Sequence, residues 1–206
     1  MRLISLPVSP FAARVRIAIR AKGLDVEIVP PPPGWATHPG FRDLSPAGRV
    51  PVLILDDGET VADSAVILEF LEEMFPGRRL LPRDPRDRAR IRFLVRHADL
   101  ALMPPMTVLA RPQEAAEVRR QVEQLVEGLE VLERLVDGED HDLTLADCAL
   151  APVLFAAEVT GQRLGLDLIA GLPGVDAYRA AIAQNEAVAV VLDEMRDGLR
   201  TLIRTA

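Results

Sequence analysis

The sequence predicts an α/β unit at the N-terminus followed by an all-helical domain. In the first 77 residues, short strand-like segments alternate with helix-like ones in the order β-α-β and then β-β-α. From residue 84 onward the strand signals end, and apolar residues recur at helical spacings of three and four. We therefore expect a first domain at 1–77, a linker at 78–83 and a helical domain at 84–206.

The first domain is expected to hold four strands and two main helices. Residues 2–6 are an apolar strand, and Ser9-Pro10 begins a helix because Ser is a favoured N-cap and Pro a favoured first helical residue. This helix ends at Lys22-Gly23. The other expected segments are a strand at 26–29, an irregular proline-rich stretch at 30–46 with a short turn at 40–44, strands at 52–55 and 60–61 joined by a hairpin at Asp57-Gly58, and a helix at 64–75.

The second domain is expected to consist of helices only. They run from Asp84 toward Leu102, from Pro112 to Val136, and over residues 144–157, 173–184 and 186–200. We expect a break at Pro104-Pro105, because proline lacks the N–H that an interior helical residue donates. Thr144 and Asp147 have capping-box spacing, which indicates a helix start rather than a catalytic pair. Cys148 beside them is expected to be a small buried residue.

Composition excludes several classes of function. A chain of 206 residues with 49% hydrophobic and 27% charged residues is typical of a globular protein. Its net charge of −7 argues against nucleic acid or an anionic membrane as partner. No apolar run approaches membrane-spanning length, and Pro7 interrupts the N-terminus too early for a signal peptide, so we expect a cytoplasmic protein. One cysteine and three histidines without metal-site spacing indicate no disulfide and no metal.

The stretch from Gly48 to Glu72 has the features of a peptide-binding site. Pro51 biases Val50 toward an extended conformation, which leaves the main-chain groups of Val50 available to a ligand. Asp63 and Ser64 stand where a helix N-terminus exposes unpaired N–H groups, which attract a carboxylate. An extended edge beside an anion-accepting helix start can hold a short peptide.

Four motifs together resemble the cytosolic glutathione transferases. They are Ser9-Pro10-Phe11 with the following 14–18 segment, Val50-Pro51-Val52-Leu53, Asp63-Ser64-Ala65-Val66-Ile67 and Thr144-Leu145-Ala146-Asp147. The resemblance covers nearly the whole chain in the right order. It implies a thioredoxin-like first domain that binds glutathione as co-substrate, an apolar electrophile bound between the domains, and a homodimer with a detoxifying role.

The resemblance also implies roles for individual residues. Ser9 would donate a hydrogen bond to the glutathione sulfur, stabilising the thiolate with help from the adjacent helix dipole. Val50 would bond the cysteinyl backbone, and Pro51 resembles the family's cis-proline. The implied partners of the two ends of glutathione are Ser64 for the γ-glutamyl carboxylate, Asp63 for the amino group, and Arg49 and His38 for the glycine carboxylate. The implied wall for the second substrate comprises Phe11, His97, Leu100, Ala101 and Pro104.

Each of these residues also has a purely structural interpretation. Ser9 and Ser64 can act as helix caps, Pro51 as the start of a strand, Arg49 as a surface charge, and the wall residues as helix-packing positions. The position of Ser9 holds no cysteine, and the single tyrosine, Tyr178, lies in the helical half, which leaves a serine-type enzyme resembling the tau and zeta classes. A glutathione-dependent cis–trans isomerase acting on maleylacetoacetate or maleylpyruvate and a non-catalytic glutathione-binding scaffold are the alternatives.

Overall fold

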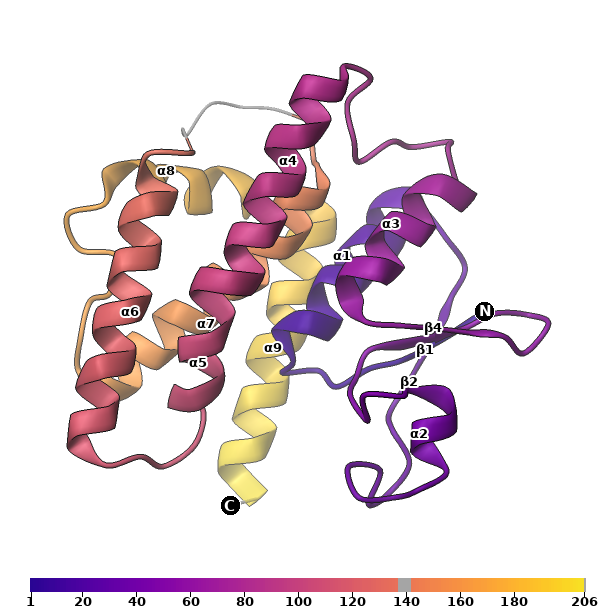
Figure 1. Ribbon diagram of the computed structural model, residues 1–206, viewed down its shortest axis with the longest axis horizontal. Helices are drawn as coiled ribbons and strands as arrows, with labels where there is room; N and C mark the ends of the chain where they lie inside the picture. Colours follow the sequence, from indigo (N-terminus) through magenta and orange to yellow (C-terminus); the bar gives the residue numbers. More distant parts are fainter. Residues whose placement is uncertain (137–141, 206) are drawn as a thin grey trace. The chain divides into compact units, whose positions relative to one another are not determined.

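The computed structural model describes residues 1–136 and 142–205 (Figure 1). Its contacts divide the chain into two compact units. The first consists of Met1–Leu81 together with Ala187–Ala206, and the second is Pro82–Glu186. The first unit contains a small mixed sheet with helices, and the described part of the second is helical, which confirms the predicted fold class.

The sheet of the first unit has four short strands in the order β2-β1-β3-β4. Strand β1 pairs in parallel with β2 and antiparallel with β3, and β3 pairs antiparallel with β4. The strands are β1 (Arg2–Ile4), β2 (Glu27–Val29), β3 (Val52–Ile54) and β4 (Thr60–Ala62). The predicted hairpin at Asp57-Gly58 therefore joins β3 to β4, and Gly58 has a φ of 90°, which glycine adopts without steric cost.

Helices cover both faces of this sheet. Figure 1 shows α1 (Pro10–Lys22) and α3 (Ser64–Met74) on one side of the strands and the short α2 (Phe41–Leu44) on the other. Successive strand residues point to opposite faces, so Ile4 and Val52 lie on one face and Leu53 on the other. Ile4 and Val52 form a buried cluster with Phe41 of α2, against which Trp35 packs.

A buried ion pair joins the end of α1 to α3. Lys22 Nζ lies 2.7 Å from Glu72 Oε2, and the two side chains are 1% and 6% exposed. Lys22 also donates to the carbonyls of Phe75 and Arg78, while Glu72 accepts from the N–H groups of Leu80 and Leu81. These contacts fix the segment that leaves α3.

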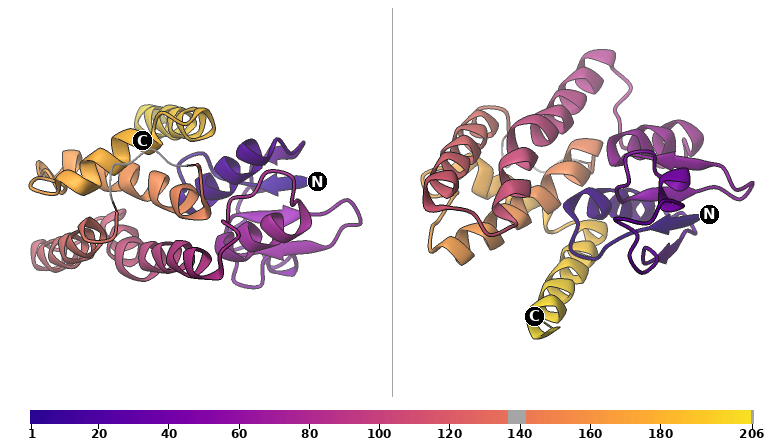
Figure 2. Two further views of the ribbon diagram at one scale, coloured as in Figure 1. Left: turned by 90° about the horizontal axis from the view of Figure 1, so that it is seen from above. Right: turned by 60° about the horizontal axis from the view of Figure 1, so that its bottom comes forward.

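The second unit is built from helices that pack side by side, with α4 against α7 and α5 against α6 (Figure 2). They are α4 (Pro85–His97), the π-helical turn η1 (Ala98–Leu102), α5 (Met103–Leu109), α6 (Ala115–Glu133), α7 (Leu145–Leu164) and α8 (Pro173–Ile182). Helix α6 begins three residues later than predicted, at Ala115, and α7 continues through Pro152 to Leu164.

The predicted break at Pro104-Pro105 is wrong. The helical path continues through η1 into α5, and both prolines lie in the first turn of α5. In that turn the N–H groups need no partner from within the helix, so proline does not prevent a helix from starting there. The irregularity falls on the π-helical turn instead.

The capping box at Thr144 is present as predicted. The Thr144 N–H donates to Asp147 Oδ2 at 2.6 Å, and Thr144 Oγ1 accepts from the Asp147 N–H. The Tyr178 hydroxyl donates to Asp147 Oδ1, and burial together with the negative charge of Asp147 raises the pKa of Tyr178. Cys148 is buried, also as predicted.

The last helix, α9 (Glu186–Thr205), packs with the first unit, whereas sequence order assigned it to the second domain. Its Glu194 pairs with Arg16 and Arg20 of α1. Contacts of this kind join segments far apart in the chain, so the sequence alone does not predict them.

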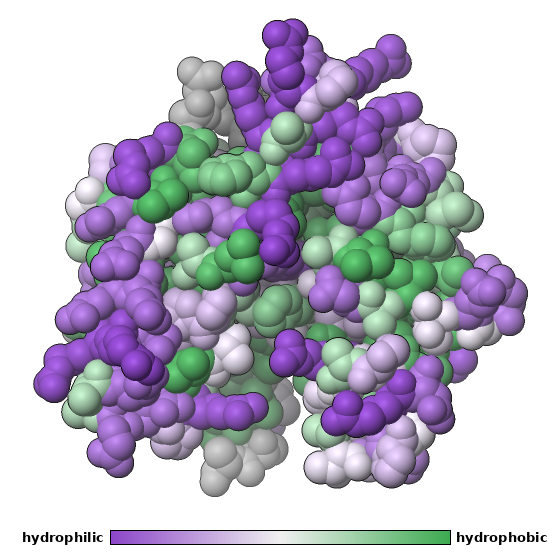
Figure 3. All heavy atoms as spheres, viewed as in Figure 1, coloured by the Kyte–Doolittle hydropathy of each residue, from purple (hydrophilic) through white to green (hydrophobic). Residues whose placement is uncertain are grey.

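Hydrophilic side chains gather over the first turns of α4 (Figure 3). The side chains of Arg86 and Arg90 there are 88% and 81% exposed, and they pair with Asp84 and Asp87. These turns are therefore a solvated surface. Among the described residues, no helix is long and apolar enough to cross a membrane.

Candidate functional site

The register of the sheet brings three segments that carry candidate glutathione residues to one edge. Ile4 lies opposite Val52, and Val52 lies opposite Ala62. The end of β1, the start of β3 and the end of β4 are therefore adjacent. The segments leading to Ser9, from Val50 and into α3 all leave the sheet at this edge.

Ser9 is the N-cap of α1. Its Oγ accepts a hydrogen bond from the Ala12 N–H at 3.3 Å, and its carbonyl accepts from the Ala13 N–H at 2.9 Å. A hydroxyl that accepts one bond still carries a proton to donate. The half-buried Ser9 can thus cap the helix and donate to a sulfur in the same conformation, at the positive end of the α1 dipole.

The edge before β3 is presented by Val50, and the Val50–Pro51 peptide is cis, as the resemblance implies. Within the described part of the chain, neither backbone group of Val50 has a hydrogen-bond partner. The side chain of Arg49 is exposed beside it and forms no ion pair with a described residue. The N–H and C=O of Val50 are therefore available to the backbone of a peptide.

Ser45 holds this edge in place and was missed by the sequence analysis. Its side chain is 1% exposed; Oγ donates to the Arg49 carbonyl at 2.8 Å and accepts from the Arg49 N–H at 3.0 Å. We call this pair of hydrogen bonds the Ser45 clamp. The sequence contains one usable signal, because Ser45-Pro46 with Gly48 two residues later is a turn pattern.

Asp63 caps α3 and has an unusual backbone. Its φ of 75° makes it the only non-glycine residue with positive φ among those described, and such conformations cluster at functional sites. Its Oδ1 accepts from the N–H groups of Ala65 at 2.9 Å and Val66 at 3.3 Å. Asp63 itself thus satisfies two of the helix-start donors that the sequence offered to a carboxylate.

Ser64 is the first residue of α3 and is 4% exposed. Its hydroxyl has no hydrogen-bond partner within residues 1–136 and 142–205. A buried hydroxyl without a partner is stabilised by a ligand that forms a hydrogen bond with it. Ser64 is therefore better placed than Asp63 to receive a carboxylate.

His38 lies in the loop before α2 and is exposed. Its Nδ1 accepts from the Gly40 N–H at 3.1 Å, which leaves Nε2 as the protonated nitrogen in the neutral ring. The ring thus shapes its own turn, and only Nε2 is available to a ligand.

The residues expected around the second substrate have different environments. Phe11, in the first unit, packs under the guanidinium of Arg14, whose Cζ lies 5.4 Å from the ring centroid. In the second unit, His97 Nε2 lies 2.8 Å from the Gly128 carbonyl oxygen, so this ring serves helix packing. Leu100 is 65% exposed, Pro104 is exposed and Ala101 is half-buried.

His97 and Ala101 both take part in a close contact with Gly128 of α6. A Cβ on Gly128 of α6 would lie 2.9 Å from Leu102 Cδ2 and 3.2 Å from the Ala101 carbonyl oxygen of η1. Glycine lets α6 and η1 approach each other, and His97 bonds the Gly128 carbonyl at this contact.

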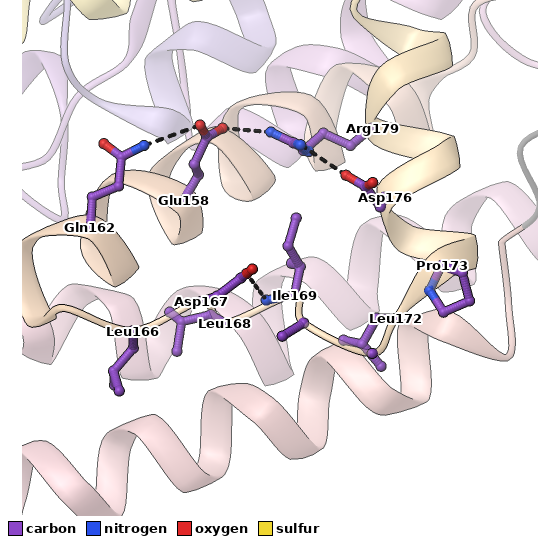
Figure 4. A pocket seen from close by; sticks show the side chains of 12 residues that line it. Glu158, Gln162, Leu166, Asp167, Leu168, Ile169, Leu172, Pro173, Asp176 and Arg179 are labelled. Carbon is purple, nitrogen blue, oxygen red and sulfur yellow. Dashed lines mark hydrogen bonds and ion pairs between the residues drawn. The ribbon is translucent and has the colours of Figure 1, made fainter.

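A cavity of about 640 Å³ lies in the second unit between α7, α8 and the loop that joins them (Figure 4). Apolar residues of the loop, including Leu168 and Ile169, form one wall. On the other wall Arg179 bridges Glu158 and Asp176, at 2.6 and 2.8 Å. One guanidinium is thus shared by two carboxylates, which holds these three side chains in ion pairs.

Among the described residues, no group of three or more His, Cys, Asp or Glu side chains has the arrangement of a metal site. The groups that converge on the sheet edge are instead a hydroxyl donor at Ser9, a backbone edge at Val50 and a second hydroxyl at Ser64. Such a set can bind a short peptide and stabilise a thiolate.

Comparisons with known proteins give a consistent result. Residues 8–74 match the family model described as glutathione S-transferase, N-terminal domain, and residues 115–181 match glutathione S-transferase, C-terminal domain. A maleylacetoacetate isomerase of Pseudomonas aeruginosa is 34% identical over 80% of this chain and 84% of its own. A probable glutathione S-transferase of Zea mays is 30% identical over 94% and 91%.

Among solved structures, a glutathione S-transferase of Methylobacillus flagellatus with glutathione bound superposes with a TM-score of 0.75. It is 27% identical in sequence, and the alignment covers 92% of this chain and 98% of that one. The two family-model matches, at residues 8–74 and 115–181, fall in the first and the second unit respectively.

Proposed function

The chain belongs to the glutathione S-transferase family, and on that premise we propose that it conjugates the thiolate of glutathione to a small apolar electrophile. The single observation that carries this proposal is the state of the Ser9 hydroxyl. It accepts from the Ala12 N–H and keeps its own proton, at the N-terminus of α1. A donor in this position favours the ionised form of a thiol.

Glutathione is held along the sheet edge. Its cysteinyl backbone pairs with the N–H and C=O of Val50, beside Pro51, as a strand pairs with an open edge. The γ-glutamyl carboxylate bonds Ser64, and the amino group pairs with the carboxylate of Asp63. The exposed Arg49 and the Nε2 of His38 attract the glycine carboxylate. These assignments are supported by the unpaired groups described above.

In the reaction, the bound thiol loses its proton to solvent and the thiolate accepts the Ser9 hydrogen bond. The sulfur lone pair forms a C–S bond at the electrophilic carbon, and the leaving group departs with its electron pair. Ser9 stays protonated throughout, because a hydroxyl is far too weak an acid to act as the base. In the second unit we assign Leu100, Ala101 and Pro104 to the wall of the electrophile, with Leu100 and Pro104 supplying exposed apolar surface.

The test is conjugation of glutathione to a chlorodinitrobenzene, followed by absorbance of the product. Activity in the intact protein that falls sharply in Ser9→Ala supports the proposal. Retention on immobilised glutathione with no turnover across a panel of electrophiles would instead favour the non-catalytic scaffold.

Glutathione-dependent cis–trans isomerisation is the second candidate, favoured by the 34% identity to a maleylacetoacetate isomerase. Here the thiolate adds to the double bond, the carbon–carbon bond rotates, and the thiolate departs unchanged. Incubation with maleylacetoacetate with and without glutathione separates the candidates, since the isomerase does not consume glutathione.

The assembly and location belong to the same proposal. We infer a homodimer, supported by the apolar Val66 and Met74 on α3, which are 53% and 57% exposed. Light scattering after gel filtration measures the mass directly. A cytoplasmic, detoxifying role is tested by fractionating the source cells and by the sensitivity of a deletion strain to electrophiles.

A further inference from the structure

We propose that helix α9 positions Ser9, with Gly198 and Glu194 holding the turn from Leu6 to Ser9 in its active conformation. This inference rests on the proposed role of Ser9. Both residues act through Ser9 and are positioning residues. Helix α9 makes two independent contacts that bear on this turn, one steric and one electrostatic.

The steric contact is at Gly198. A Cβ there would lie 2.8 Å from Pro7 Cβ and 2.9 Å from Val8 Cγ1, closer than carbon atoms pack without movement. Gly198 is inside a helix of 20 residues, where glycine is less stable than alanine. Its presence lets α9 touch the two residues that precede Ser9.

The electrostatic contact runs through Arg16. Its Nε lies 3.2 Å from Glu194 Oε2, an ion pair whose geometry is too bent for a hydrogen bond. The buried guanidinium donates to Ser5 Oγ at 3.1 Å, to the Leu6 carbonyl at 3.3 Å and to the Pro7 carbonyl at 2.8 Å. Glu194 thus supplies the counter-charge for the group that binds this turn.

The hydrogen bonds of Arg16 lead to Ser9 through the Leu6 carbonyl. The Leu6 carbonyl accepts both the Arg16 Nη1–H and the Ser9 N–H, the latter at 3.2 Å. Burial lowers the pKa of Arg16, and the negative charge of Glu194 opposes that shift, so Glu194 offsets part of the cost of burying the guanidinium. A displaced turn would move the Ser9 hydroxyl, and small misplacements of a catalytic group are costly to turnover.

The experiment compares variants of the full chain. In Gly198→Ala we expect kcat to fall roughly five-fold or more, with the KM for glutathione changing less than about two-fold. The pKa of the bound thiol, read from thiolate absorbance against pH, should rise. A double variant with Val8→Ala removes one of the two clashing atoms and should recover part of kcat.

Glu194→Gln removes the charge and keeps the size of the side chain, so it decides the question even where Gly198→Ala fails to fold. Its matched control is Asp193→Asn, because Asp193 is 71% exposed and pairs with Arg196. Glu194→Gln should raise the pKa of the bound thiol and Asp193→Asn should not.

Two results are distinguishable. Wild-type kcat and bound-thiol pKa in both Gly198→Ala and Glu194→Gln, with activity lost in Ser9→Ala, would overturn the positioning role and leave the proposed function standing. Full turnover in Ser9→Ala would overturn the role of Ser9 on which this inference rests, and no turnover of the intact protein across a panel of electrophiles would overturn the proposed function itself.

Discussion

Replacing Ser9 removes two interactions that different substitutions can separate. In Ser9→Ala, α1 loses its cap, and under the proposed mechanism the thiolate loses its donor. Loss of an N-cap costs about 1 kcal/mol of stability. Ser9→Asp keeps a good capping acceptor but has no proton to donate at neutral pH, and Ser9→Thr keeps both functions.

The expected loss of turnover follows from the strength of the hydrogen bond. A bond to a charged group contributes about 1.5–3 kcal/mol, and about 1.4 kcal/mol corresponds to one pKa unit. Losing it should raise the pKa of the bound thiol by about one to two units. If that thiol titrates near 6.5, a rise of about two units lowers the thiolate at pH 7 from roughly three quarters to roughly 3%. We expect turnover to fall roughly ten-fold, between about three-fold and twenty-five-fold.

The assay is conjugation rate against pH, with urea unfolding measured in parallel. Ser9→Ala should lose both activity and stability, Ser9→Asp should lose activity but keep stability, and Ser9→Thr should keep both. If the Asp variant keeps its activity as well as its stability, the donor role is refuted and Ser9 is a helix cap only. Recovery of the Ala variant at high pH, where free thiol ionises, would support it.

The other predictions concern the supporting structure. Ser45→Ala removes the Ser45 clamp and should raise the KM for glutathione several-fold with little change in kcat; an unchanged KM would show that the clamp does not position the edge. Glu72→Gln leaves Lys22 buried without its counter-charge and should lower the free energy of unfolding by about 3 kcal/mol, whereas the exposed neighbour Glu73→Gln should not. Because the pKa of Tyr178 is raised on folding, its stabilising contribution is complete below about pH 10 and lost as pH rises through the folded pKa. The wild type should therefore lose stability in that alkaline range with the onset of tyrosinate absorbance, and Tyr178→Phe should lack this loss.

The elements that the sequence predicts best are those with local signals. Ser9-Pro10 starts α1, Asp57-Gly58 turns the hairpin, and the capping box starts α7. Each signal depends on hydrogen bonds or dihedral angles within a few residues, so it can be recognised without knowledge of the tertiary structure. The π-helical turn η1 and the packing of α9 with the first unit depend on distant contacts, and no local pattern predicts them.

The residues of the candidate site show the same difference between local signals and distant contacts. The edge at Val50 and the helix starts at Ser9 and Asp63 are recognisable in the sequence because each motif is continuous. Ser45 was missed because its effect passes through the backbone of another residue, and Glu194 because 178 positions separate it from the arginine it pairs with, Arg16. Residues that position others leave no motif of their own.

The structural and functional interpretations of a helix cap need not compete. At Ser9 the hydroxyl oxygen accepts the capping hydrogen bond, and the hydroxyl proton remains available to donate to a thiolate. The two roles therefore do not exclude each other. At Asp63 the same reasoning gives a different result, because Oδ1 already binds two N–H groups of α3 that a ligand carboxylate would need. The negative charge of Asp63 would also repel that carboxylate and attract an amino group. The chemistry of the α3 start therefore favours the zwitterionic end of a γ-glutamyl group, with its carboxylate at Ser64 and its amine at Asp63, over a simple anion.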